Sequence, residues 1–86
     1  MIENREEFGK KIREARKEQD VGLRQLARIV DIDYSNLSRI ERGQRPPPDL
    51  EIIIKISKEL GVDRDELLRL AGVPDELIQK EGRQNL

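Results

Sequence analysis

Residues that begin and end helices recur at short intervals along this chain, and they limit it to short helices. Three glycines follow apolar stripes, where a left-handed residue often ends a helix: Gly43, Gly61 and Gly72. Three aspartates precede such stripes, where a carboxylate can accept hydrogen bonds from first-turn N–H groups: Asp33, Asp49 and Asp63. Three successive prolines, Pro46 to Pro48, exclude a helix between Gly43 and Asp49. This spacing favours an all-α fold.

Apolar residues recur at helical spacing between these signals and predict five or six helices. The first three are expected at about Arg5 to Glu18, at Leu23 to Val30 with Gly22 as the N-cap, and at Tyr34 to Arg42. The others follow Asp49 and Asp63 or begin at Pro74. Expected inner positions of the first and fourth helices are Phe8, Ile12, Ala15 and Gln19, and Leu50, Ile53, Ile56, Ser57 and Leu60. Residues 1–81 are expected to form one domain and residues 82–86 a short flexible tail.

Composition removes most enzyme chemistry from consideration. The 86 residues include no Cys and no His, which excludes disulfides, thiolate or imidazole metal sites, and Ser-His-Asp or Cys-His catalysis. Neither an enzyme nor a cofactor is therefore expected. No apolar run approaches the roughly 18 residues of a membrane span, and the N-terminus lacks the apolar segment of a secretory signal. We expect a cytoplasmic protein with no membrane partner.

The charge is small overall and unevenly distributed. A formal net charge of −1 gives the whole molecule no electrostatic preference for a polyanion. Residues 21–48 nevertheless carry five basic and three acidic side chains, whereas residues 49–86 carry six basic and nine acidic ones. The middle of the chain is therefore net positive and its rear net negative.

The second and third expected helices form a helix-turn-helix, because only Asp31, Ile32 and Asp33 separate them. At about 100° per residue, one side of the third helix carries Leu37, Ile40 and Glu41. The other side and its flanks carry only hydrogen-bonding or cationic groups: Tyr34, Ser35, Asn36, Ser38, Arg39 and Arg42. Such groups can read base edges, since Asn pairs with adenine and Arg with guanine in the major groove.

The run LARIVDIDYSNLSRIERG, from Leu26 to Gly43, resembles the helix-turn-helix of the XRE family, the Cro and lambda-repressor-like DNA-binding domains. The family pattern is roughly LAxxxGVSxxxISRIExG. The similarity extends more loosely from Phe8 to about Val73, and includes GKKIREAR before the motif and DLEIIIKISKELGVDRDELL after it. It implies a lambda-repressor-like bundle of five to six helices with the helix-turn-helix at about residues 22–43.

The resemblance also implies roles for the matching positions. Base-reading positions fall on Tyr34, Ser35, Asn36 and Arg39. Phosphate-contacting positions fall on Leu23, Arg42, Gln44 and Arg45, and the backbone at Gly22 and Leu23, assisted by Arg24 or Gln25, can hold a phosphate. A structural ion pair is implied between Arg16 and Glu41. Three alternatives stay open: Tyr34 can pack over the turn, Asn36 can bond the local backbone, and the arginines can form a solvated helix end.

The sequence departs from the family pattern at several positions. Gly22 and Leu23 stand where a Ser and a Gln are frequent, so the amide contact to a phosphate is lost. Asp31 replaces the usual Gly of the turn, a position that commonly needs positive φ, which Asp tolerates better than most residues. Asp33 replaces Ser as the cap and places a carboxylate close to the expected phosphates. The loop at residues 44–48 is one residue longer than usual.

These observations predict a sequence-specific DNA-binding transcriptional regulator, most simply a repressor, that binds double-stranded DNA at an inverted-repeat operator. Apolar residues near the end, among them Leu70, Leu77 and Leu86, exceed what two short helices must bury, and either pack internally or form a homodimer on DNA. Two alternatives remain, each with a protein partner. In the first, the chain is the antitoxin of a toxin-antitoxin pair. In the second, it is a protein-interaction module that keeps only the helix-turn-helix scaffold.

Overall fold

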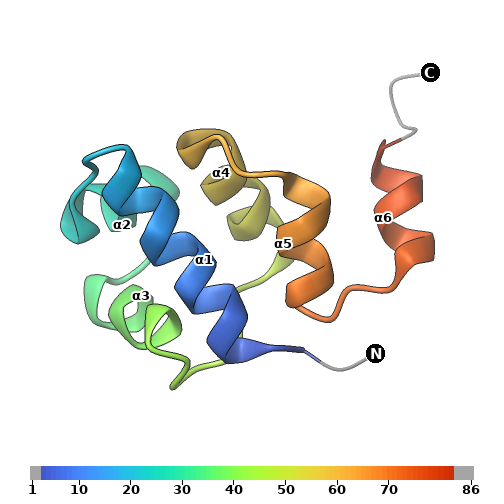
Figure 1. Ribbon diagram of the computed structural model, residues 1–86, viewed down its shortest axis with the longest axis horizontal. Helices are drawn as coiled ribbons and strands as arrows, with labels where there is room; N and C mark the ends of the chain where they lie inside the picture. Colours follow the sequence, from blue (N-terminus) through green and yellow to red (C-terminus); the bar gives the residue numbers. More distant parts are fainter. Residues whose placement is uncertain (1–2, 83–86) are drawn as a thin grey trace.

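Six helices account for most of residues 3–82, where the sequence predicts five or six. The computed structural model describes residues 3–82 and places helices at α1 Arg5–Glu18, α2 Leu23–Val30, α3 Tyr34–Glu41, α4 Leu50–Leu60, α5 Arg64–Leu70 and α6 Asp75–Gly82 (Figure 1). No strand occurs in this part of the chain, so the all-α prediction is confirmed. None of these six helices is long and apolar enough to cross a membrane. Gly82 ends α6, and the rest of the predicted tail lies outside the described residues.

Most predicted helix ends are confirmed. Asp33 and Asp63 accept hydrogen bonds from first-turn N–H groups of α3 and α5, and the glycines that follow three of the helices have φ of +74°, +66° and +87°. Asp49 occupies the N-cap of α4, but its side chain accepts no capping bond. Pro74 precedes α6 instead of beginning it, because its carbonyl accepts from the N–H groups of Leu77 and Ile78.

The core fills the space where α1 meets α3, α4 and α5. Its buried apolar side chains are Phe8, Ile12, Ala15, Leu26, Ala27, Val30, Leu37, Ile40, Ile53, Ile56, Leu60, Leu67, Leu68 and Ile78. Two predicted core positions are wrong. Leu50 is 37% exposed at the start of α4, and Gln19 lies at the surface as the C-cap of α1. The Gln19 amide instead donates to the carbonyl of Leu60 at 2.6 Å, which joins the ends of α1 and α4.

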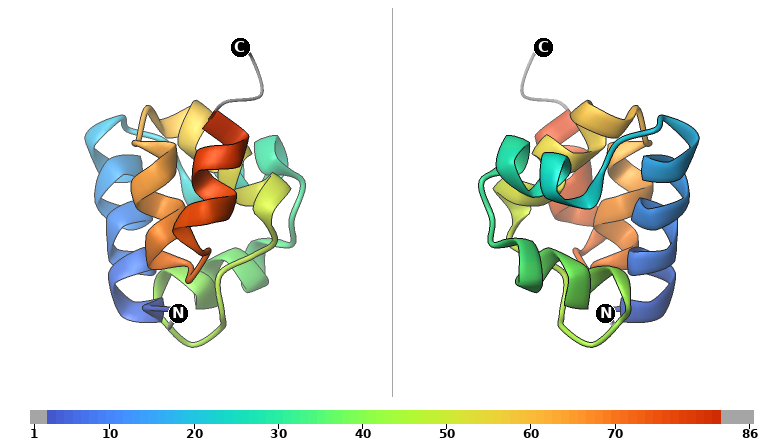
Figure 2. Two further views of the ribbon diagram at one scale, coloured as in Figure 1. Left: turned by 90° about the vertical axis from the view of Figure 1, so that its right-hand side faces the viewer. Right: turned by 90° about the vertical axis from the view of Figure 1, so that its left-hand side faces the viewer.

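A glycine in the middle of α1 allows α3 to approach closely. A Cβ added at Gly9 would lie 2.4 Å from the carbonyl oxygens of both Ile40 and Glu41. Any larger residue must therefore push the two helices apart. This contact fixes the C-terminal end of α3 against α1, while α2 packs against α3 from another side. In the whole molecule, α2 and α3 lie together at one end, and α6 lies beside α5 at the other (Figures 1 and 2).

Candidate nucleic-acid interface

The turn between α2 and α3 is held by the backbone. Asp31 adopts φ +63° and ψ +50°, the left-handed conformation expected at this position of the motif. The N–H of Ile32 then donates to the carbonyl of Ala27 at 3.0 Å, and Ile32 itself is half-buried against the core. The turn therefore places α3 in one orientation relative to α2.

The two sides of α3 differ in burial as the helical spacing predicts. Leu37, Ile40 and Glu41 are buried and attach the helix to the core. Of the expected base readers, Tyr34, Ser35 and Arg39 are exposed and Asn36 is half-buried. The exposed side of the helix thus consists of polar and cationic groups on a firmly seated element.

The start of α3 is organised by one carboxylate oxygen. Asp33 Oδ2 accepts from the N–H groups of Ser35 and Asn36 at 3.1 and 3.2 Å, and also from the Ser35 hydroxyl. The hydroxyl of Ser35, followed by the N–H of Asn36, lowers the pKa of Asp33 below its ordinary value. Asp33 is therefore ionised at neutral pH, and the hydroxyl proton of Ser35 points toward it.

Arg24 on α2 lies over the ring of Tyr34, with its guanidinium carbon 4.4 Å from the ring centroid. This distance suits a cation–π interaction, which is worth about 0.5–1 kcal/mol at exposed sites. The ring itself is 41% exposed. Arg24 and Tyr34, which the resemblance assigned to phosphate and base contacts respectively, thus form one surface at the start of α3.

A buried ion pair joins α1 to the end of α3. Arg16 donates from Nε and Nη2 to the two carboxylate oxygens of Glu41 at 2.8 and 3.0 Å, and from Nη1 to the carbonyl of Val21 at 3.0 Å. Only 13% of the Arg16 side chain and 4% of the Glu41 side chain are exposed. The hydrogen bonds to Glu41 raise the pKa of Arg16 above its ordinary value, against the effect of burial. The structure thus brings together the two residues that the resemblance pairs.

The side chains expected to help at the start of α2 are engaged elsewhere. Gln25 turns back and accepts from the N–H of Gly22 at 3.4 Å, which is half of a capping box. Arg24 lies over Tyr34, and Leu23 is half-buried against the core. Neither Arg24 nor Gln25 is therefore free to contact a phosphate beside Leu23.

Arg13 on α1 is the cationic residue that lies near Leu23 instead. It lines a hollow of about 190 Å³ together with Leu23 at the start of α2 and Ser38 and Arg42 on α3. Arg42 is held there, since its Nε and Nη2 donate to the carbonyl and hydroxyl of Ser38 at 3.3 and 3.1 Å. Arg13 is not among the site residues predicted from the sequence, although Lys10, Arg13 and Lys17 form a cationic series at helical spacing.

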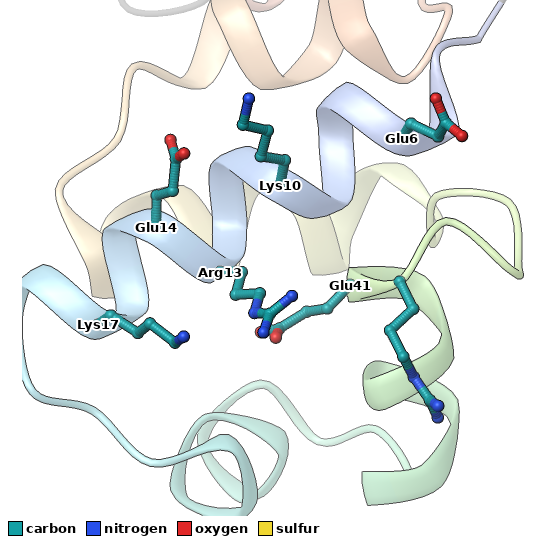
Figure 3. Close-up of a pocket in the computed structure, with 7 residues that line it drawn as sticks. Glu6, Lys10, Arg13, Glu14, Lys17 and Glu41 are labelled. Atoms are coloured by element: carbon teal, nitrogen blue, oxygen red, sulfur yellow. The ribbon is translucent and has the colours of Figure 1, made fainter.

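That series continues along α1 into a larger groove of about 540 Å³ between α1 and the end of α3 (Figure 3). Its lining residues are Glu6, Lys10, Arg13, Glu14, Lys17, Glu41 and Arg42. Arg13 and Lys17 lie on the side of α1 that faces α2 and α3, whereas Lys10 and Glu14 point the other way (Figure 3). Beyond the end of α3, Gln44 and Arg45 are exposed in the following loop.

This combination of a tight turn, a seated second helix and its polar outer side defines a helix-turn-helix domain. A family model described as "Helix-turn-helix domain" matches residues 9–73, and the chain belongs to that family. The resemblance to XRE-type domains is thereby confirmed.

Three proteins illustrate the similarity. The HTH-type transcriptional regulator RghRB of Bacillus subtilis, itself described as uncharacterized, is 32% identical over 92% of this chain, which spans only 60% of that protein. SinR, a master regulator for biofilm formation solved in complex with DNA, is 34% identical with a TM-score of 0.64 over 71% of this chain and 97% of SinR. The restriction-modification controller protein C.AhdI of Aeromonas hydrophila is 33% identical with a TM-score of 0.62 over 70% and 89%. SinR has also been solved in complex with SinI, with 27% identity and a TM-score of 0.64 over 88% of this chain and 79% of the matched chain.

Proposed function

We propose that this chain is a sequence-specific regulator of transcription that binds double-stranded DNA with α3 in the major groove. One observation carries the proposal: the outer side of α3 presents only hydrogen-bonding and cationic groups, while Leu37, Ile40 and Glu41 fix the helix to the core. A helix held in this way can enter a groove without losing its orientation. The similarity to SinR, solved in complex with DNA, supports the same assignment.

Base discrimination is assigned to the start and the exposed side of α3. The proposed readers are Tyr34, Ser35, Asn36 and Arg39. Arg39 can pair bidentately with guanine and Asn36 with adenine, and the Tyr34 ring can contact a thymine methyl. The stacked position of Arg24 lets the Tyr34 ring meet a base with its orientation already restricted, which lowers the entropy lost on binding.

Phosphate contacts are assigned to both ends of the motif. At the end of α3 they are made by Arg42, Gln44 and Arg45. At the start of α2 they are made by the backbone of Gly22 and Leu23, with Arg24 and Gln25 nearby. To these the geometry adds Arg13, whose guanidinium lines the hollow beside Leu23 where the family's glutamine is absent. A phosphate there would meet Arg13 and Arg42, and the Glu41 carboxylate that also lines the hollow is paired with Arg16.

The proposed regulator is a repressor that binds an inverted repeat as a homodimer. Two recognition helices of a dimer meet successive major grooves when they lie about 34–36 Å apart. Leu77, one of the apolar residues that the sequence assigns either to internal packing or to a homodimer, is exposed on α6. This helix lies at the end of the molecule opposite α2 and α3. A regulator bound across a promoter excludes the transcription machinery. Association with a second protein is a further proposal, supported by the similarity to SinR in its complex with SinI.

Selection from random duplexes tests the proposal directly. The purified chain is incubated with the pool at about 0.1 M salt, and the retained duplexes are amplified and sequenced over several rounds. An enriched inverted repeat with half-sites about 10 bp apart is expected. A single short motif would retain sequence reading but contradict the dimer. A pool that stays random would contradict DNA reading altogether.

A further inference from the structure

The Asp33 carboxylate uses only one of its oxygens to cap α3. Three donors converge on Oδ2, namely the N–H groups of Ser35 and Asn36 and the Ser35 hydroxyl. Within residues 3–82, no hydrogen bond reaches Oδ1. The side chain is exposed, so this second oxygen lies at the surface while the first is held in place. An N-cap serine could satisfy the helix equally well, and the extra oxygen is therefore not required by the cap.

The neighbouring hydroxyl strengthens the same chemistry. Since the Ser35 hydroxyl donates its proton to Asp33, its oxygen presents only lone pairs to any other partner. Asp33 and Ser35 therefore offer acceptors, and no donor, at the start of the helix proposed to enter the major groove. A partner at this position must supply a hydrogen-bond donor.

Only two bases present a donor in the major groove. Cytosine shows its N4 amine and adenine its N6 amine, whereas guanine and thymine show acceptors only. Adenine places the N7 acceptor next to its amine, and a carboxylate would be repelled there. Cytosine has no acceptor on that edge, so it fits a pair of acceptors better than adenine does.

The cation that would complete a base-pair contact lies exposed on the same helix. The positive charge of Arg39 contributes to lowering the pKa of Asp33, although no ion pair joins the two side chains in the described part of the chain. A guanidinium binds the O6 and N7 atoms of guanine bidentately. In a C·G pair, the cytosine amine and these guanine acceptors lie side by side in the same groove.

We propose that Asp33 is a specificity-determining residue, whose Oδ1 accepts a hydrogen bond from the N4 amine of a cytosine while Arg39 donates to the guanine paired with it. This assignment rests on the proposed DNA-binding function and deepens it. It predicts one C·G pair in each half-site, in a fixed orientation. The capping role of Asp33 continues through Oδ2.

Two variants separate base reading from capping. Asp33→Ser keeps a good N-cap and removes the second oxygen, whereas Asp33→Asn keeps the cap through its carbonyl and replaces the acceptor by an amide donor. The matched control is Asp63→Ser, which makes the same exchange at the N-cap of α5, outside the helix-turn-helix. Each protein is selected on random duplexes, and its affinity is then measured on the wild-type consensus and on duplexes changed at each C·G pair. Thermal unfolding verifies that each variant folds.

The expected result is a change of preference at one base pair. Wild type and Asp63→Ser should lose affinity roughly ten- to hundred-fold when that C·G pair is replaced. Asp33→Ser should lose part of this penalty, because Arg39 still reads the guanine, and Asp33→Asn should lose at least as much, because its amide places a donor beside the cytosine amine. Both Asp33 variants can also bind every duplex more tightly, since a negative charge is removed, and comparison among duplexes for one variant separates this uniform effect. If the folded Asp33 variants keep the full wild-type penalty at every position, the inference is overturned while DNA binding stands. If wild type itself selects no sequence, the proposed function fails, and the inference falls with it.

Discussion

The two flanks of α1 each hold an ion pair, and the pairs differ in their surroundings far more than in their length. Toward α3, Arg16 and Glu41 meet at 2.8 Å with 13% and 4% of their side chains exposed. Toward α5, Lys11 and Glu66 also meet at 2.8 Å, with 37% and 47% exposed. Water screens the second pair, and two flexible side chains lose rotamer freedom in forming it. The first pair leaves an unpaired buried charge if either partner is removed. Equal distances therefore give unequal consequences.

The two flanks also differ in the charges that surround them. Beside the α3 flank lie Arg13, Lys17 and Arg42 around the hollows next to the helix-turn-helix. Beside the α5 flank, Lys11 is surrounded by carboxylates, and its neighbours are Glu14, Glu18, Asp63 and Glu66. A DNA backbone would be attracted to the first flank and repelled by the second. Changes on the α3 flank are therefore expected to affect stability or DNA binding, and changes on the α5 flank to affect both much less.

The largest effect is expected from Glu41→Ala. It leaves the Arg16 guanidinium buried without its partner, and should lower the free energy of unfolding by about 3–5 kcal/mol. A small domain has only about 5–15 kcal/mol to lose, so DNA binding will fall as the folded population falls. Urea unfolding followed by circular dichroism measures the change.

The control is the double variant Arg16→Met, Glu41→Leu, which removes both charges and keeps apolar bulk. It should recover much of the lost stability, because no charge is stranded. A loss of less than about 1 kcal/mol for Glu41→Ala would place this pair with the exposed ones and remove the contrast between the flanks.

Gly9→Ala tests the close approach on the same flank, and here the sign of the effect is decisive. In a helix without neighbours, alanine is about 1 kcal/mol more favourable than glycine. A Cβ 2.4 Å from two α3 carbonyl oxygens must instead push α3 away, and such overpacking typically destabilises by about 1–3 kcal/mol. Calorimetric melting should show a lower transition temperature, and a higher one would mean that the helices separate without strain.

The sequence predicts the local parts of this fold because they depend on neighbours in the chain. Asp33, Asp63 and the glycines that end helices act within a few residues, so their spacing alone places most helix boundaries. Gly9 could not be interpreted in this way. Its importance lies in the carbonyl groups of a segment about thirty residues later, and in sequence it is only a weak helix former.

The candidate site likewise has parts that the sequence predicts and parts that it does not. The polar side of α3 follows from helical periodicity, and the pairing of Arg16 with Glu41 follows from the family pattern. The contacts of Arg13 and Arg24 depend on how α1, α2 and α3 are packed, and no local rule states them. Helical spacing did contain a signal for Arg13, since Lys10, Arg13 and Lys17 recur at intervals of three and four along α1. Only the structure shows which of them lie beside the helix-turn-helix.

A smaller effect, on binding and not on stability, is expected from Arg13→Ala. If its guanidinium holds a phosphate beside Leu23, the variant should bind all duplexes more weakly. The negative slope of log affinity against log salt should become shallower by about 0.9, the value for one phosphate contact. Fluorescence anisotropy between about 50 and 200 mM salt measures this slope. Lys11→Ala is the matched control, because it removes a positive charge from the other flank of the same helix. If both variants change the slope equally, the flanks do not differ in their contact with DNA, and the effect is one of net charge.

The smallest effect is expected from Lys11→Ala on stability. Near neutral pH its unfolding midpoint should lie at most slightly below that of wild type, because the pair with Glu66 is exposed to solvent. Even this small difference should disappear in alkali. The hydrogen bond to Glu66 raises the pKa of Lys11 above its ordinary value of 10.5 in the folded state, so any stabilisation is present below that value and disappears as the pH rises through the folded pKa. Melting curves from neutral pH into alkali should therefore fall more steeply for wild type than for the variant. A loss of more than about 1 kcal/mol at neutral pH would show that water screens this flank less than its exposure implies, and that the two pairs of α1 differ in degree only.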